Sequence, residues 1–248
     1  MDKALLKAWR EAALVKNNQN TSKVQHLPVP PMEKPCPAGS KILMLPEPEL
    51  LDDHEVSFLE LVELRATIRE YAEMPMSLKD LSYLLWCTQG VKQILPGGAT
   101  KRTVPSAGAR NALETYLLID RVDGLEPGLY RYLPLEHALF PVEIGEAVKV
   151  KMEPAFTKVN MYRNSAVTFI WTAVLERMEY SFGGRALQYL YLDAGHICQN
   201  LYLAGYTLHI GVCAVGSFND NELNDLLGLD GENEFAVYAA HTGIMKQG

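Results

Sequence analysis

Apolar residues recur at intervals of three and four positions in several segments, and this spacing predicts helices. The clearest is residues 186–204, whose apolar stripe ends at Gly205, and we expect it to be the central core helix. The other predicted helices begin at residues whose side chains can accept a hydrogen bond from an amide that the first turn leaves free. They start at Ser57, with Glu60 in capping-box spacing, at Ser77, before a helix that runs towards Gly90, and at Asn219, with Glu222 three residues on.

Shorter apolar runs predict strands. Residues 166–173 form a continuous run, which is typical of a central strand covered on both faces. Further strands are predicted over residues 114–120, 128–132, 207–216 and 235–240. Buried strands flanked by long helices predict a layered α+β domain.

The first 50 residues follow a different pattern. A short amphipathic segment, residues 5–14, precedes a proline-rich stretch over residues 27–48. Proline favours extended backbone without a core of its own. We therefore expect residues 1–50 to form a helix and an arm that wraps the domain or a partner subunit, with a disordered linker as the alternative. The folded domain is assigned to residues 51–248.

Composition narrows the class of protein. The chain has 248 residues, 48% of them hydrophobic, which suffices for one large domain. Its net charge of -7 is dispersed, so a nucleic-acid surface is not expected. No apolar run approaches the roughly 18 residues of a membrane span, and the N-terminus lacks a signal-peptide core, which favours a cytoplasmic protein. The four cysteines form no CxxC pair, so no metal site is expected.

Three segments carry candidate chemistry. The small-residue loop, residues 103–109 (Thr-Val-Pro-Ser-Ala-Gly-Ala), would let backbone approach a flat ligand closely. Arg65 and Arg69 flank Thr67 and are permanently charged forks suited to phosphate oxygens or an electron-rich ring edge. Residues 210–218 form an apolar strand broken at glycine. Each segment alone also fits a structural role, as an ordinary loop, a solvated helix end or a plain strand.

Together and in this order, the three segments resemble the FMN-dependent nitroreductase superfamily, and in particular its SagB-type dehydrogenase branch. Residues 102–108 match the branch's Arg-Thr-Val-Pro-Ser-Ala-Gly loop, and residues 124–132 reproduce its Gly-Leu-Glu-Pro-Gly-Leu-Tyr-Arg-Tyr segment. Residues 193–201 are similar to its Glu-Ala-Gly-His-x-x-Gln-Asn helix, and residues 216–229 to its C-terminal Leu-Leu-Gly-Leu region. The likeness covers residues 57–244.

The resemblance implies a three-layer α-β-α fold with a central mixed, largely antiparallel sheet. It also implies a homodimer with FMN at the interface, where a hydride or electron pair passes between a reductant such as NAD(P)H and an unidentified organic acceptor. The reaction is carried by the flavin, so no catalytic side chain is assigned, and His196 is given a structural or interface role. The alternatives are a flavin-binding carrier, sensor or assembly subunit without turnover, and a flavin-free interaction domain. The implied cofactor contacts are Arg65, Ala66, Thr67, Arg69, Pro105, Ser106, Ala107, Gly108, Ala214, Gly216, Ser217 and Lys246.

Several positions depart from the branch pattern. His209 replaces a usual glycine, and Ile244 replaces a terminal basic residue for which Lys246 is a substitute. Arg110-Asn111 replaces an apolar pair, which is expected to reshape the substrate side of the pocket. Ser181-Phe182 stands where the azoline dehydrogenases of the branch carry a Lys-Tyr pair, so a peptide azoline oxidase is disfavoured.

Overall fold

Helices and strands follow one another closely along the chain. The computed structural model describes residues 4, 7, 21–48, 57–96 and 99–246. The helices are α2 (Phe58–Leu64), α3 (Leu78–Gln89), α4 (Ala147–Met152), α5 (Val159–Asn164), α6 (Leu175–Phe182), α7 (Ala186–Thr207) and α8 (Asp220–Leu227). The strands are β1 (Leu43–Met44), β2 (Val91–Leu95), β3 (Ala99–Arg102), β4 (Leu113–Ile119), β5 (Gly128–Leu133), β6 (Ala138–Ile144), β7 (Val167–Val174), β8 (Ile210–Val215) and β9 (Glu234–Ile244). Most of the helix predicted within residues 1–50, and the proposed boundary after residue 50, lie outside the described residues.

Within the described residues, one sheet contains seven strands in the order β1-β6-β5-β4-β7-β9-β8. Each neighbouring pair in this sheet is antiparallel. Every residue of β4 and β7, at the centre, is buried. Because successive side chains of a strand point to opposite faces, both faces of these strands must be covered. The predicted central strand over residues 166–173 is confirmed.

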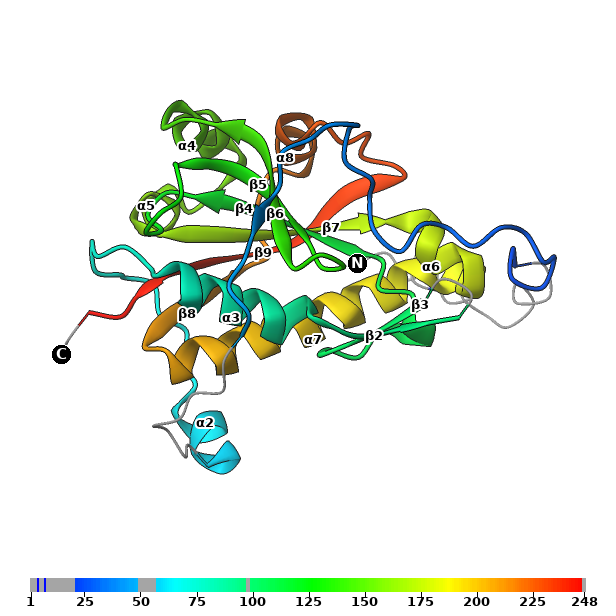
Figure 1. Cartoon of the computed structure of the whole chain (residues 1–248), viewed down its shortest axis with the longest axis horizontal. Coiled ribbons are helices and arrows are strands. Elements are labelled where there is room, and N and C mark those ends of the chain that lie inside the picture. The colour runs from blue at the N-terminus through cyan, green and yellow to red at the C-terminus, as the bar shows by residue number, and fades with distance from the viewer. Residues whose placement is uncertain (1–3, 5–6, 8–20, 49–56, 97–98, 247–248) are drawn as a thin grey trace.

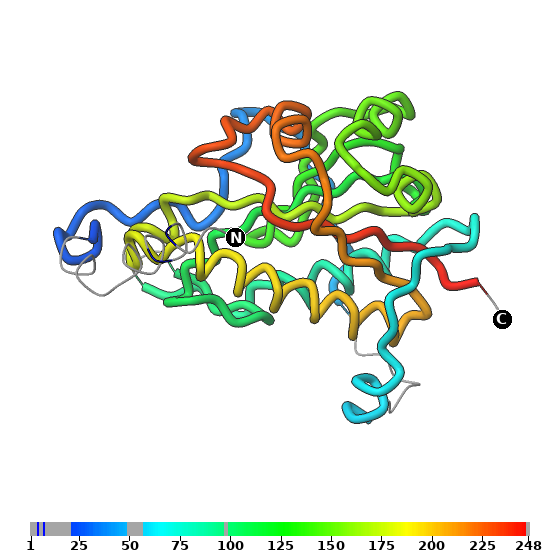
Figure 2. The backbone as a smooth tube through the Cα atoms, turned by 180° about the vertical axis from the view of Figure 1, so that it is seen from behind, coloured from blue at the N-terminus to red at the C-terminus, as the bar shows by residue number. Residues whose placement is uncertain are grey.

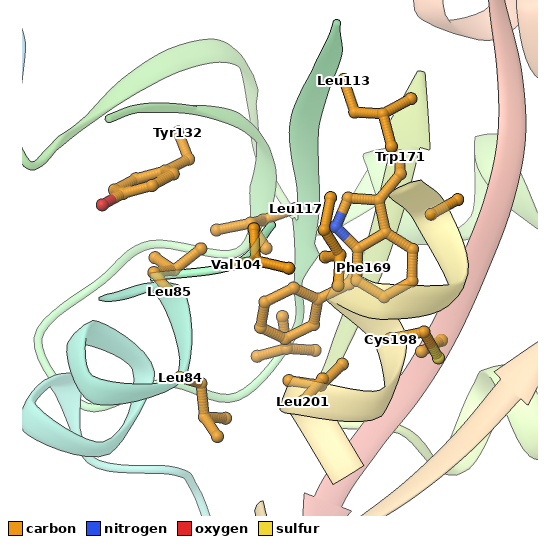
Figure 3. Packing of buried hydrophobic residues seen from close by; sticks show 14 of the residues in the cluster. Leu84, Leu85, Val104, Leu113, Leu117, Tyr132, Phe169, Trp171, Cys198 and Leu201 are labelled. Carbon is orange, nitrogen blue, oxygen red and sulfur yellow. The ribbon is translucent and has the colours of Figure 1, made fainter. Parts of the chain in front are cut away.

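Helices cover the two faces of the sheet (Figure 1). α3 and α7 pack on one face, and α4, α5 and α8 lie over the other. On the first face, Leu84 and Leu85 of α3 and Leu201 of α7 belong to one buried cluster with Phe169 and Trp171 of β7 (Figure 3). The predicted α+β fold with three layers is therefore confirmed.

The predicted helix N-caps are confirmed at two of the three positions. The Ser77 side chain accepts a hydrogen bond from the Asp80 amide at 3.0 Å, and Asn219 accepts one from Glu222 at 3.3 Å. The Ser57 side chain makes no cap hydrogen bond, although α2 begins after it as predicted.

Gly205 does not end α7, which continues to Thr207. A Cβ at Gly205 would lie 2.8 Å from the backbone oxygen of Ile210. The glycine therefore allows the helix to pass close to β8, which begins at Ile210 rather than at residue 207 as predicted. Glycine is needed at this position for close packing of the helix against the strand, and it does not end the helix.

Two glycines allow the segment after α2 to cross the edge of the sheet. This basic segment, residues 65–71, runs beside β8 and the end of β9, and Figure 2 shows it in cyan next to the red C-terminal strand. A Cβ at Gly211 would lie 2.6 Å from Ile68, and one at Gly243 would lie 2.7 Å from Tyr71. The absence of a side chain at Gly211 and Gly243 thus allows the basic segment to approach the sheet closely.

The proline-rich arm lies on its own domain over the described residues 21–48. The Lys34 amide donates to the Glu114 carboxylate of β4 at 2.8 Å, and Arg131 donates to the backbone oxygens of Lys34 and Pro35. Met44 of β1 pairs with Ala138 of β6. Buried charges on the sheet therefore fix the arm in an extended path without a core of its own.

A carboxyl group on the arm makes stability depend on pH. Burial raises the pKa of Glu33 to about 7, and the neighbouring Glu136 and Glu114 carboxylates add to the shift. Between about pH 4.5 and 7 the folded chain holds a proton that the unfolded chain has lost. This contribution to the free energy of unfolding is therefore complete below pH 4.5 and is lost as the pH rises through 7.

We expect Glu33→Gln to reduce this pH dependence, because the neutral amide does not titrate. Urea unfolding at pH 5 and pH 8 checks the prediction. The stability of the variant should rise relative to wild type as the pH increases. Glu126→Gln, at an exposed loop residue, is the matched control, and its stability should show the same pH dependence as wild type. Parallel pH profiles for wild type and Glu33→Gln would contradict the assignment.

Candidate functional site

Tyr202, towards the C-terminal end of α7, is where the basic segment and β8 meet. Its phenol oxygen accepts a hydrogen bond from the Ala214 amide at 2.9 Å and lies 3.3 Å from the Thr67 hydroxyl. The Arg65 guanidinium lies over its ring, 5.4 Å from the centroid, within the range of a cation–π interaction. One side chain thus joins three residues that the resemblance assigns to the cofactor.

The rest of the basic segment presents positive charge at the surface. Ala66 and Arg69 are exposed. Burial raises the pKa of the Cys213 thiol on β8, and the charge of nearby Arg69 opposes that shift. Lys246 forms an exposed ion pair with Glu70 at 2.9 Å. Because an exposed ion pair contributes little free energy, Lys246 can exchange this partner for another anion.

Asp193, nearer the N-terminus of α7, holds the small-residue loop. One carboxylate oxygen accepts the Ser106 hydroxyl at 2.6 Å, and the other accepts the Ala107 amide at 3.1 Å. The Ser106 oxygen in turn accepts the Asn111 amide at 2.9 Å. Asp193 is 4% exposed, and burial raises the pKa of its carboxyl while these hydrogen bonds oppose the shift. The loop is therefore fixed from beneath by a buried acid.

The backbone at this loop is left-handed at three positions. The φ angles are 55° at Gly108, 52° at Ala109 and 45° at Asn111. Such backbone costs roughly 1–2 kcal/mol for a residue with a Cβ, although Asn adopts it more readily. The Asn111 side chain donates to the backbone oxygen and the hydroxyl of Thr100, both at 3.0 Å, which offsets part of that cost. A strained loop is kept in one shape, with Pro105 and Gly108 exposed.

The residues after β8 are linked to α7 by the aromatic ring of Tyr238. Gly216 and Ser217 are exposed, and the Thr157 hydroxyl donates to the Ser217 backbone oxygen at 2.7 Å. A Cβ at Gly216 would lie 3.8 Å from the ring of Tyr238 on β9. Tyr238 also hydrogen-bonds Cys198, which lies between Asp193 and Tyr202 on α7. The end of β8 is thereby connected to the middle of the helix.

The predicted site residues form two groups along α7. The basic segment, Ala214 and Lys246 lie around Tyr202 and the β8–β9 edge, whereas residues 105–108 lie at Asp193. Nine residues separate Asp193 from Tyr202 in sequence, or roughly 14 Å along a helix. The structure joins each group internally and separates the two groups along less than half of α7.

Sequence reasoning assigned no role in the site to Asp193 or Tyr202. A buried acid on an apolar helix was the available signal for Asp193, because such a group needs partners. Nothing local distinguished Tyr202 from the other tyrosines of the helix.

His209, one of the departures from the branch pattern, keeps a left-handed backbone. His209, which replaces a usual glycine, has a φ of 55° and is exposed. Its backbone oxygen accepts the Met245 amide at 2.9 Å. The position thus keeps the left-handed backbone that glycine favours, and the imidazole is directed to the surface without breaking the contact with the C-terminal strand.

Two cavities lie beside this region. One, of about 500 Å³, is lined by Lys246 and by Tyr71, Ala72, Glu73, Arg121, Arg163 and Asn164. The other, of about 490 Å³, lies among α2, α3 and α7 and is mostly apolar. Neither is lined by Arg65, Thr67 or Ala214. Across the described ranges, no group of three or more His, Cys, Asp or Glu residues is placed to hold a metal ion. No helix there is long and apolar enough to span a bilayer.

Comparison with known proteins places this arrangement in one family. The model of the nitroreductase family matches residues 62–244. Three proteins, each named a putative nitroreductase, are similar to the chain. That of Methanocaldococcus jannaschii is 33% identical over 181 residues, which cover 73% of this chain and 89% of that protein. The crystal structure from Ralstonia eutropha superimposes with a TM-score of 0.67 at 23% identity and covers 90% of this chain and 96% of the other.

The third, from Desulfovibrio desulfuricans, was crystallised in complex with FMN. It superimposes with a TM-score of 0.55 at 15% identity and covers 78% of this chain and 89% of the other. The two crystal structures support the fold, and the matched family model and the archaeal relative extend the likeness to the sequence. This chain belongs to the nitroreductase family.

Proposed function

We propose that the chain is an FMN-dependent oxidoreductase of the SagB-type branch. It would move a hydride or electron pair between a reductant such as NAD(P)H and an organic acceptor. The observation that carries the proposal is the junction at Tyr202, where a guanidinium, a hydroxyl and the edge of β8 meet. Family membership, the FMN-bound relative and the sequence motifs support the same cofactor.

The side chains fit the chemistry of that cofactor. FMN supplies reversible two-electron chemistry when bound, so the protein has only to bind, orient and tune it. Arg65 and Arg69 would neutralise the phosphate or the electron-rich pyrimidine edge. Gly108 would admit the flat ring system because it is exposed and has no side chain. Positive charge near the pyrimidine edge would also favour the anionic reduced cofactor.

We further propose that two copies of the chain complete each site. One copy holds its two groups of site residues at separate points of α7, and the outer face of this helix exposes Leu187, Tyr191 and Leu192. α2 projects below α7 (Figure 1) and exposes Phe58 and Leu59. Exposed apolar surface of this kind marks an interaction site. Pairing through α7 and α2 would bring the loop of one copy towards the basic segment of the other.

Replacing Arg65 or Arg69 with alanine should weaken FMN binding. Each loss of a charge-assisted hydrogen bond is expected to cost about 1.5–3 kcal/mol, or tenfold and more in affinity. Quenching of FMN fluorescence on titration measures the change. Lys151→Ala, at an exposed basic residue of α4 over the other face of the sheet, is the control and should bind as wild type does. Wild-type affinity in both Arg65→Ala and Arg69→Ala would refute the assignment.

An absorbance spectrum of the purified protein, before and after anaerobic addition of NADH or NADPH, tests the whole proposal. A flavin band that the nucleotide bleaches would support a nicotinamide-linked oxidoreductase. A flavin band that persists with both nucleotides, and with added acceptors after chemical reduction, would favour the alternative of a carrier or sensor without turnover. A protein that takes up no FMN would overturn the proposal.

A further inference from the structure

The Tyr202 phenol links three elements of the fold. Tyr202 belongs to α7, and its phenol oxygen contacts Thr67 of the basic segment and Ala214 of β8. The Arg65 guanidinium covers its ring, and Thr67 is itself half-buried. A side chain held on these sides has little freedom to reorient.

Donor and acceptor chemistry limits how the protons can be arranged at this junction. A backbone amide can only donate, so the Ala214 N–H occupies an acceptor site on the phenol oxygen. The phenol then has one proton to donate, and the Thr67 oxygen lies 3.3 Å away. A threonine hydroxyl that accepts this proton keeps its own proton, which must point elsewhere. Either hydroxyl can donate across this distance. When the phenol donates, the chain of hydrogen bonds runs from Ala214 through Tyr202 to Thr67 and leaves the Thr67 proton for another acceptor.

We propose that Tyr202 is a positioning residue that orients the Thr67 hydroxyl as a hydrogen-bond donor to the bound cofactor. The inference rests on the proposed function, because it takes FMN as the acceptor. Tyr202 need not touch the cofactor itself. A donor whose direction is already fixed loses less rotational freedom on binding, so the contact contributes more to affinity. The same phenol, through its ring, keeps the Arg65 charge beside that hydroxyl.

A set of variants at the two positions tests this role. Tyr202→Phe removes the phenol oxygen and keeps the ring under Arg65. Thr67→Val removes the hydroxyl at nearly constant shape, whereas Thr67→Ser retains it. Tyr206→Phe, one turn further along α7, removes a phenol that contributes no hydrogen bond to this junction and is the matched control. FMN affinity is measured by fluorescence quenching for each, and thermal unfolding of the FMN-free proteins checks that they fold.

We expect Tyr202→Phe and Thr67→Val each to weaken FMN binding about five- to tenfold, and Tyr206→Phe to leave it unchanged. The decisive comparison is between double variants at the two positions. Adding Tyr202→Phe to Thr67→Ser should weaken FMN binding by the full five- to tenfold factor. Adding it to Thr67→Val should weaken binding little. A merely structural tyrosine would cost the same in both backgrounds, so equal losses would overturn the inference.

Two further outcomes separate this inference from the proposed function. If Tyr202→Phe does not fold, Thr67→Ser must still bind FMN much more tightly than Thr67→Val, and equal affinities would refute the role of the hydroxyl. If wild type itself fails to quench FMN fluorescence, the proposed function is wrong, and this result is visible before any variant is compared.

Discussion

Glu114→Ala is expected to lower the free energy of unfolding by about 3–5 kcal/mol, because it leaves buried charges without their partner. Glu114 lies on the central strand β4 and is 3% exposed. Its carboxylate contacts Arg177 of α6 at 2.6 Å, Arg131 of β5 at 3.6 Å and the Lys34 amide of the arm at 2.8 Å. Two atoms of the Arg177 guanidinium, Nε and Nη1, are already buried without a partner. Loss of the acid would remove the main compensation for that charge.

Chemical unfolding with urea, followed by circular dichroism, measures this change. The matched control is Glu143→Ala, whose ion pair with Lys151 is exposed and should contribute at most about 1 kcal/mol. Glu114→Ala should also release the arm, so proteolysis near residues 31–36 should become faster. A loss no greater than that of the control would show that the buried arginines find other partners.

Asp193→Ala is expected to weaken FMN binding about a hundredfold, if the loop meets the cofactor as we propose. The substitution removes the acceptor of two hydrogen bonds, those from the Ser106 hydroxyl and the Ala107 amide. Hydrogen bonds to charged groups contribute about 1.5–3 kcal/mol each, so a loss near 3 kcal/mol is expected. The left-handed backbone at Ala109 and Asn111 should then become more mobile, because Ser106 keeps only its bonds from the Asn111 and Ala109 amides, which lie within the loop itself.

Fluorescence titration with FMN and hydrogen exchange of the loop amides measure the two consequences separately. Asp193→Asn should have an intermediate effect, because its amide oxygen can replace only one carboxylate oxygen. Asp225→Ala, at an exposed position on α8, is the control for loss of an acid on a helix. Faster exchange in the loop with unchanged FMN affinity would mean that the loop does not contact the cofactor.

Prediction from sequence succeeded where interactions are local or where burial is uniform along a segment. Ser77 and Asn219 cap their helices because the side chain and the amide it accepts lie within one turn. Residues 166–173 signalled a strand covered on both faces through their unbroken apolar character. The short helices α4 and α5 went unpredicted, because a helix of six residues has too few turns to show a period.

The sequence by itself determined the layers, the central strands, the long helix and the three segments that carry candidate chemistry. Only the tertiary structure decided how those segments are held. Asp193 meets Ser106 from 87 residues away, and Tyr202 meets Thr67 from 135 residues away. The acid on an apolar helix signals that Asp193 needs partners, but neither partner can be read from the local pattern, since an acid or a tyrosine has the same periodicity whatever it touches. Long-range hydrogen bonds depend on where the sheet places its edges, and that placement exists only in the folded chain.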